Sequence, residues 1–228
     1  MTTEATIDTS LRPLEAIRAV RRLQANPEDT SQAFAIFRAM RGKSGLKTFR
    51  RFAASPTGAR VIREKRRLLD ILSDRAGLAA LPQESFGRRY FNFLEAERLS
   101  AEGLVQASQS WENDPLPAEM ELYRERMRDA HDLTHVLTGY GRDGLGELCL
   151  LAFMHAHNRN PAAALIVLMS LNRMPRPARR AVFEAWRNGR KARWLQDQDF
   201  EALLPRPLDE VRRELQIATP SLYPMAMP

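Results

Sequence analysis

Apolar residues recur every three or four positions along almost the whole chain, whereas the strict alternation of a half-buried strand is missing. This spacing is typical of amphipathic helices. In segment 10–24, Ser10 is a candidate N-cap and Pro13 stands in the first turn. One apolar stripe runs along that segment: Leu14, Ile17, Val20 and Leu23. The pattern predicts an all-α fold.

The periodicity predicts further helices at 30–41, 46–54 and 57–73 in the first third of the chain. In the first of these, Phe34, Phe37 and Met40 would point inward, and Gly42 would follow the helix end. The core face of the third would carry Val61, Leu68, Leu69 and Leu72. The remaining ranges are 85–98, 100–111, 118–138, a helix that Glu147 opens, 161–172, 177–194 and 207–215. We expect one domain over residues 1–228, a bundle of about eight to ten helices with irregular tails at 1–9 and 217–228.

The helix expected at 118–138 combines an apolar stripe with two histidines. His131 and His135 are four positions apart, so both imidazoles lie on the same face, one helical turn apart. That face is the one that the apolar residues mark as inward. The residues that share it are Met120, Tyr123, Met127, Ala130, His131, Thr134, His135 and Thr138.

A carboxylate from the next helix can join this histidine pair. Four glycines lie between 139 and 146, and they predict a turn that folds Glu147 back beside the first helix. Asp132 lies about 100° around the helix from His131, close enough for its short side chain to reach an ion. Imidazoles and carboxylates suit zinc, iron, manganese or cobalt rather than a thiolate-bound metal. The spacing predicts a divalent metal site between two adjacent helices, with His131, Asp132, His135 and Glu147 as ligands.

An alternative interpretation needs no metal. A histidine on an apolar stripe is often a hydrogen-bonded core residue, and Glu147 could serve only to favour its helix start. Burial of several unpaired polar groups would cost several kcal/mol, which favours the metal site. His155 and His157 are each rotated about 80° from Glu147 on the same helix, so we assign them an outer-shell or structural role. Cys149 lies in an apolar run and is expected to be a small buried residue.

Charge is concentrated in two runs. The net charge is +7, and residues 38–75 contain 12 basic and 3 acidic residues. Residues 172–194 contain 8 basic residues and 1 acidic residue. Such runs can contact an anionic membrane surface or nucleic acid, or they can be solvated helix faces. No zinc-finger spacing, aromatic RNA-binding signature or helix-turn-helix accompanies them, so nucleic-acid binding is not expected.

Nothing in the sequence predicts export or a membrane span. The first residues lack the basic start and apolar core of a signal peptide. No stretch reaches about 18 apolar residues. The single cysteine fits a reducing compartment. We therefore expect a cytoplasmic protein.

The motif and its surroundings resemble a known family. His131, Asp132, His135 and Glu147 form the pattern H-D-x-x-H-x(11)-E. Together with LPQESFGRRYFNFLEAERL, LTGYGRDGLGE and the stretch AWRNGRKARW to VRREL, this pattern resembles the coenzyme Q biosynthesis protein 4 family, over residues 80–216. The GYGRDG turn differs from the GMPTN-like loop of mitochondrial members.

The resemblance implies a mostly helical protein with a divalent metal, commonly zinc, at the four matched positions. It also implies a role in ubiquinone biosynthesis, in which the ring carboxylate of a polyprenylated hydroxybenzoate is replaced by a hydroxyl. The expected partners are this polyprenylated substrate or another isoprenoid lipid, and the other ubiquinone-biosynthesis proteins assembled at the membrane. The role also implies peripheral binding to the cytoplasmic side of the inner membrane, on whose anionic surface the basic helices could lie. A homodimer is compatible with this role. The apolar region from Cys149 to Leu171 could line a channel for the prenyl tail, and Arg142 could neutralise the benzoate.

Two other functions remain open. Zinc has no redox chemistry. Oxidative replacement of the carboxylate therefore needs either direct reaction of the ring with oxygen or a redox metal such as iron bound by the same ligands. Manganese also fits these ligands. Four protein ligands would also leave a tetrahedral zinc without an open position. The chain could then be a non-catalytic lipid-binding scaffold with a structural metal. A metal-dependent phosphohydrolase is disfavoured because further separated His and Asp ligands are missing.

Overall fold

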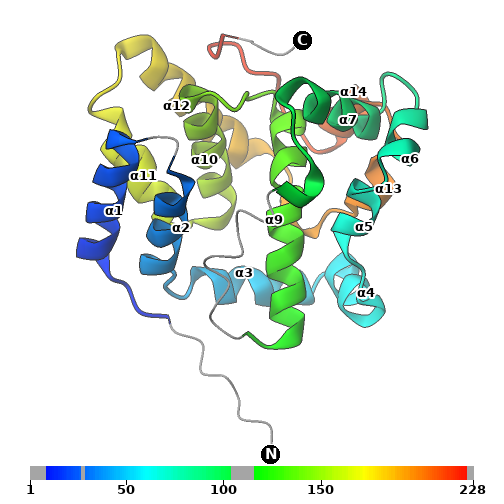
Figure 1. Cartoon of the computed structure of the whole chain (residues 1–228), viewed down its shortest axis with the longest axis horizontal. Helices are drawn as coiled ribbons and strands as arrows, with labels where there is room; N and C mark the ends of the chain where they lie inside the picture. The colour runs from blue at the N-terminus through cyan, green and yellow to red at the C-terminus, as the bar shows by residue number, and fades with distance from the viewer. Residues whose placement is uncertain (1–8, 27–28, 104–115, 225–228) are drawn as a thin grey trace, which may run out of the picture.

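Helix α9 (Ala118–Thr138) stands in the centre of the computed structural model, and the other helices surround it (Figure 1). The structure describes residues 9–26, 29–103 and 116–224. On one side of α9 lie α1 (Pro13–Ala25), α2 (Thr30–Ala39), α10 (Gly144–Asn158), α11 (Pro161–Leu171) and α12 (Arg176–Lys191). On the other side lie α4 (Pro56–Glu64), α5 (Leu68–Leu72), α6 (Arg75–Ala80), α7 (Phe86–Glu97), α13 (Phe200–Leu203) and α14 (Leu208–Glu214). Helix α3 (Ser44–Ala53) crosses near the lower end of α9, and η1 (Leu195–Asp197) is a single 3₁₀ turn.

The all-α prediction is confirmed, because every regular element in the described residues is a helix. These residues contain thirteen α-helices and one 3₁₀ helix, more than the eight to ten expected. Part of the difference is the helix predicted at 57–73, which is divided into α4 and α5. Lys65 ends α4 in the left-handed conformation, with φ of 51°, and the chain changes direction there. Helices α6, α13 and η1 are too short to show an apolar period.

The helix predicted at 118–138 matches α9 at both ends. The helix predicted at 100–111 falls mostly on residues 104–115, outside the described ranges. Its described start, residues 101–103, is helical, and the Gly103 amide donates to Ser100 Oγ at 3.1 Å. The expectation about a signal peptide also concerns mainly residues outside the described part.

The N-terminal helices pack on a different face from the one predicted. Helix α1 begins at Pro13 after Arg12, not at a Ser10 cap, and Leu14 is 70% exposed. On α2 the fully buried residues are Ile36 and Ala39, whereas Phe34, Phe37 and Met40 are only partly buried. The small side chains of Ala16, Ala19 and Ala39 let the two helices approach closely, and the Arg12 amide donates to the carbonyl of Ala39 at 2.7 Å. The face that allows this close packing is buried, rather than the face with the largest apolar side chains.

One apolar core joins the helices on both sides of α9, which makes the described chain a single domain. Leu133, Val136 and Leu137 supply the central part of α9 to this core. A smaller cluster forms beside the first half of α9 from Phe52, Val61, Tyr123 and Trp194. The two clusters hold α9 along most of its length, so it is a rigid support for the histidines.

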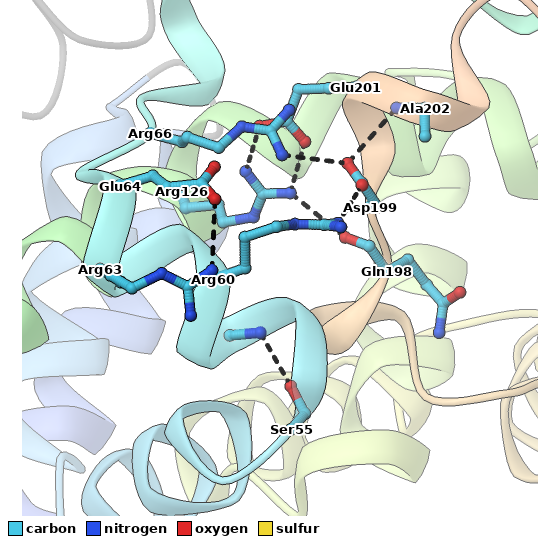
Figure 2. A network of polar contacts seen from close by, with 11 residues as sticks. Ser55, Arg60, Arg63, Glu64, Arg66, Arg126, Gln198, Asp199, Glu201 and Ala202 are labelled. Atoms are coloured by element: carbon cyan, nitrogen blue, oxygen red, sulfur yellow. Dashed lines mark hydrogen bonds and ion pairs between the residues drawn. The ribbon is translucent and has the colours of Figure 1, made fainter.

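A buried ionic network ties α9 to the segment around α13 (Figure 2). The Arg126 guanidinium is fully buried and binds both carboxylate oxygens of Glu201, at 2.8 and 2.7 Å. It also donates to the carbonyl of Gln198 at 3.2 Å. Arg66 lies 3.9 Å from both Glu201 and Asp199, and Arg60 also binds Asp199. Burial raises the pKa of Glu201, but Arg126 outweighs this and holds that pKa well below its usual range.

Substitution of Arg126 is expected to be strongly destabilising. Arg126→Met would leave the mostly buried Glu201 carboxylate without its bidentate partner, which costs about 3–5 kcal/mol of unfolding free energy. The measurement is urea denaturation. Arg63→Met is the control, because the Arg63 side chain is 71% exposed and its pair with Glu64 should contribute about 0.5 kcal/mol. Equal losses for the two variants would contradict the assigned role of the network.

Candidate metal centre

The two histidines of α9 lie one above the other on its inward face. Their ring centroids are 4.8 Å apart, with the ring planes at 70°. His135 is completely buried and stacks on Phe93 of α7 at a centroid distance of 5.9 Å. The His131 side chain is 40% exposed, so it forms the outer edge of the site. The prediction that both histidines share one face is confirmed.

Hydrogen bonding places a proton on Nδ1 of His135. This Nδ1 lies 2.8 Å from the carbonyl oxygen of Tyr140, and a carbonyl can only accept, so Nδ1 carries the proton. In the neutral imidazole the lone pair is then on Nε2, which is the atom that can bind a metal. This Nε2 is buried and has no hydrogen-bond partner among the described residues. An unpaired buried polar atom is costly, and a bound cation would satisfy it.

Asp132 is mostly buried beside His131. Its Oδ1 accepts a hydrogen bond from His131 Nδ1 at 3.1 Å, which directs His131 Nε2 away from the carboxylate. Burial raises the pKa of Asp132, but the hydrogen bond and charge of His131 outweigh it, and the pKa stays below its usual value. One ligand atom from each of His131, Asp132 and His135 lies within 4.8 Å of the others, so this group could hold a metal ion.

Glu147 approaches both imidazoles from α10. Its carboxylate oxygens lie 3.4 Å from His135 Nε2 and 3.9 Å from His131 Nε2. Burial raises the pKa of Glu147, but the two histidines and Arg142 outweigh it and leave the pKa lowered. The structure therefore brings together all four residues of the predicted site. Two Nε2 atoms and a carboxylate converge, and Asp132 orients one of the imidazoles as carboxylates commonly orient metal-binding histidines.

The glycine turn makes this convergence possible. Gly139 ends α9 with φ of 77°, a conformation that other residues rarely adopt. At Gly146 the chain passes so close to the carbonyl of Gly141 that a Cβ would lie 2.1 Å from the oxygen. Asp143 caps α10 by accepting from the amides of Leu145 and Gly146 at 3.0 and 3.1 Å. The helix thus starts at Gly144, three residues before Glu147.

The C-terminal segment braces this turn, a contact that sequence reasoning missed. The Tyr223 hydroxyl accepts from the Gly141 amide at 3.1 Å and donates to the Asp143 carboxylate. Arg212 of α14 donates to the carbonyls of Val136 and Leu137, both at 2.9 Å, near the end of α9. Residues 217–224 are irregular, as expected, but Ile217 and Tyr223 are buried. The sequence feature that could have indicated this contact is a tyrosine in a tail flanked by prolines.

The Tyr223 hydroxyl is expected to stabilise the turn. Tyr223→Phe removes both of its hydrogen bonds and should lower the unfolding free energy by about 1–2 kcal/mol. Hydrogen exchange should become faster at the amides of Gly141, Leu145 and Gly146, whose acceptors depend on this arrangement. The control is Leu222→Ala, at a half-exposed neighbour, which should be nearly neutral. Unchanged exchange at Gly141 would show that the hydroxyl does not hold the turn.

His155 and His157 lie away from this cluster. His155 Nδ1 is 3.0 Å from the carbonyl of Asn160 near the end of α10. His157 packs edge-on against Phe153 at 5.0 Å. Burial lowers the pKa of His157 to about 4, so this histidine is neutral in the folded protein at neutral pH. Both contacts are those of structural histidines.

His157 should make the fold sensitive to acid. Its pKa is about 4 in the folded chain and 6.5 by reference, so the unfolded chain binds more protons between those values. Stability should therefore fall as the pH drops through this window, by about 3 kcal/mol from this residue. Denaturant titrations at pH 7, 5 and 4 should show a smaller decrease for His157→Leu. An unchanged pH dependence would exclude this contribution.

A small hollow of about 80 Å³ lies beside the exposed edge of the site. Its wall is mostly apolar and comes from α9, α10 and the segment 195–200. The lining residues are Met127, Ala130, His131, Thr134, Leu150, Met154, Leu195, Gln196 and Phe200. Leu150 and Met154 belong to the region expected to line a channel. Arg142 lies 3.9 Å from Glu97, and its positive charge also lowers the pKa values of Asp132 and Glu147.

Fold and site together define an all-helical protein with a histidine–carboxylate cluster between two consecutive helices. Residues 14–221 match the model of the family described as coenzyme Q (ubiquinone) biosynthesis protein Coq4. The chain belongs to this family, and the resemblance inferred from the motif is confirmed. Membership gives it a role in ubiquinone biosynthesis.

Relatives and a solved structure agree with this assignment. The chain is 29% identical over 187 residues to a mitochondrial ubiquinone biosynthesis homologue of Bos taurus, covering 79% of this chain and 69% of that one. The homologue of Danio rerio, also named mitochondrial, is 31% identical over 175 residues, covering 75% of this chain and 63% of that one. The crystal structure of a proposed ubiquinone biosynthesis protein of Nostoc punctiforme superposes with a TM-score of 0.65 at 18% identity, covering 92% of this chain and all of that one. This last likeness concerns the fold alone.

Proposed function

We propose that this protein acts in ubiquinone biosynthesis as a metal-dependent enzyme that replaces the ring carboxylate of a polyprenylated hydroxybenzoate by a hydroxyl, with oxygen as the oxidant and the carboxylate leaving as carbon dioxide. The observation that carries the proposal is the buried Nε2 of His135, which has no hydrogen-bond partner among the described residues and faces a carboxylate and a second imidazole. His157 also has a buried Nε2 without a hydrogen-bond partner, but that ring packs against Phe153. The carboxylate and second imidazole that converge on His135 are what distinguish it from a structural histidine.

The donor set fits a divalent metal. His131, His135 and Glu147 would hold it, and Asp132 would orient His131 or act as a fourth, weaker ligand. Zinc is the metal that the family resemblance favours, and iron or manganese suits the same ligands. When bound, the metal supplies Lewis-acid stabilisation of negative charge on the aromatic carboxylate or phenol.

The chain's own residues would bind and orient the substrate. The apolar hollow beside His131 suits the part of the aromatic ring that carries the prenyl chain. Arg142 would supply positive charge to the benzoate. Asp132 is mostly buried and accepts a hydrogen bond from His131, so it can hold the imidazole in one tautomer or take up a proton.

A lipid-tailed substrate requires a protein that works at a membrane. None of the helices in the described ranges is long and apolar enough to cross a bilayer. Because the proposed substrate carries a lipid tail, we propose peripheral binding to the cytoplasmic face of the inner membrane, with the other ubiquinone-biosynthesis proteins as partners. A homodimer is compatible with this arrangement.

A lipid-binding scaffold with a structural metal is the second candidate. It is favoured by the number of protein groups at the site, because four ligands would close a tetrahedral zinc and leave no position for substrate. The two functions differ in one measurable respect, since only the enzyme turns over substrate.

The deciding experiment incubates the purified chain, loaded with zinc, iron or manganese, with a short-chain prenylated hydroxybenzoate and oxygen. Glu147→Gln keeps the shape of the side chain and removes its charge. We expect it to weaken metal affinity and to lower turnover, each by about 100-fold, in a protein with an unchanged circular dichroism spectrum. Glu95→Gln is the control, because Glu95 lies on α7 and pairs with Arg75.

Other outcomes would reject the enzymatic proposal. Tight metal binding without turnover under any of the three metals, with loss of ubiquinone from cells that lack the protein, would favour the scaffold. Release of phosphate from nucleotides would indicate a metal-dependent phosphohydrolase. Failure of the wild-type chain to bind any metal would remove the basis of the site.

A further inference from the structure

The two basic runs of the sequence have different surroundings in the structure. In the first run, several arginines are paired with carboxylates. Arg60 and Arg66 meet Asp199 and Glu201 (Figure 2), and Arg67 lies 3.3 Å from Glu125. Arg75 pairs with Glu95. The positive charge of residues 60–75, the second half of this run, is thus partly used within the fold.

The second run is centred on α12, and its charges are not used in this way. Among the residues that the structure describes, no carboxylate lies within ion-pair distance of an α12 guanidinium. The acidic residue of α12, Glu184, instead accepts hydrogen bonds from the amides of Ser221 and Leu222, at 3.2 and 2.9 Å. The arginines of α12 therefore present almost uncompensated positive charge.

Helix geometry collects these arginines on one face. Ala181, Val182, Ala185 and Gly189 are buried against α10, and a Cβ at Gly189 would lie 2.4 Å from the carbonyl of Phe153. The opposite face follows from the 100° rotation per residue. It carries Arg176, Arg180, Phe183, Arg187 and Arg190, all of them exposed. This set is called the α12 outer face below.

An exposed aromatic residue lies in the middle of the α12 outer face. Phe183 is 59% exposed and stacks on Trp186 at a centroid distance of 5.6 Å. Arg187 and Arg190 lie over the rings of Phe183 and Trp186, at 6.0 and 5.0 Å. Leu222, tied to the same helix through Glu184, is 50% exposed. Large apolar side chains exposed among cations are characteristic of helices that lie in a membrane interface.

We propose that the α12 outer face binds an anionic lipid bilayer, with Phe183 inserted among the headgroups and the arginines on the lipid phosphates. The charge of the face is complementary to an anionic leaflet, and its aromatic residues suit the interfacial region. The reason for such membrane binding depends on the function proposed above, in which the substrate has a lipid tail. It assigns the contact to α12 and not to the basic run 38–75, in which several arginines are already paired.

The test measures flotation of the full chain with vesicles of phosphatidylcholine containing one quarter phosphatidylglycerol, in low salt and without substrate. We expect binding to these vesicles and little binding to pure phosphatidylcholine. Arg180→Gln with Arg187→Gln should lower the partition coefficient by about tenfold or more. Phe183→Ser should lower it by about tenfold, because an exposed apolar anchor is lost.

The matched control is Lys43→Gln with Arg50→Gln, which removes two exposed charges from the other basic run. It should retain vesicle binding close to that of the wild type. Loss of binding in this control, with normal binding of both α12 variants, would overturn the assignment. So would a change of oligomeric state caused by Phe183→Ser without a change in vesicle binding, or preferential binding of single-stranded DNA.

Turnover of a detergent-dispersed short-chain substrate separates this inference from the proposed function. If the α12 variants retain turnover but lose vesicle binding, the membrane surface is supported independently of the chemistry. Vesicle binding in a chain without turnover would support the surface and reject the enzymatic function. If wild-type protein turns over substrate but does not bind anionic vesicles, only the proposed membrane surface is rejected.

Discussion

The candidate site depends on the reversal of the chain between α9 and α10. His135 lies three residues before the end of one helix and Glu147 three residues after the start of the next, so only a tight turn can bring them within 3.4 Å. The left-handed Gly139 and the Asp143 cap create that turn from local interactions. The same turn carries Tyr140, whose carbonyl fixes the tautomer of His135. Backbone direction and imidazole chemistry are therefore set together.

Sequence reasoning worked best where the determinants are local. Both ends of α9 were predicted, because Pro117 and Gly139 adjoin a regular apolar stripe. The four residues of the candidate site lie within 17 positions, and helical spacing alone relates the two histidines. Their convergence with Glu147 needed only the turn between two consecutive helices.

The errors concern interactions between distant parts of the chain. The face that α2 buries is decided by how closely α1 can approach, which a single-helix pattern does not contain. The split at Lys65 needs a positive φ at a residue type that rarely adopts it. The role of Arg126 and Arg66 depends on acidic residues about 75 and 135 positions away. The sequence of a basic run does not distinguish arginines that pair with carboxylates inside the fold from arginines that face solvent.

The hydrogen bond between Tyr223 and Asp143 influences the order in which parts of the protein fold. It joins residues 80 positions apart, so Tyr223 is synthesised well after Asp143. Closing so long a loop is slow relative to forming a helix, so the turn beside Glu147 is secured late in folding. On a ribosome, the turn could not gain this contact until residue 223 had emerged. Any ion that the cluster takes up would enter a completed scaffold, unlike the metal of a zinc finger, which directs folding from the start.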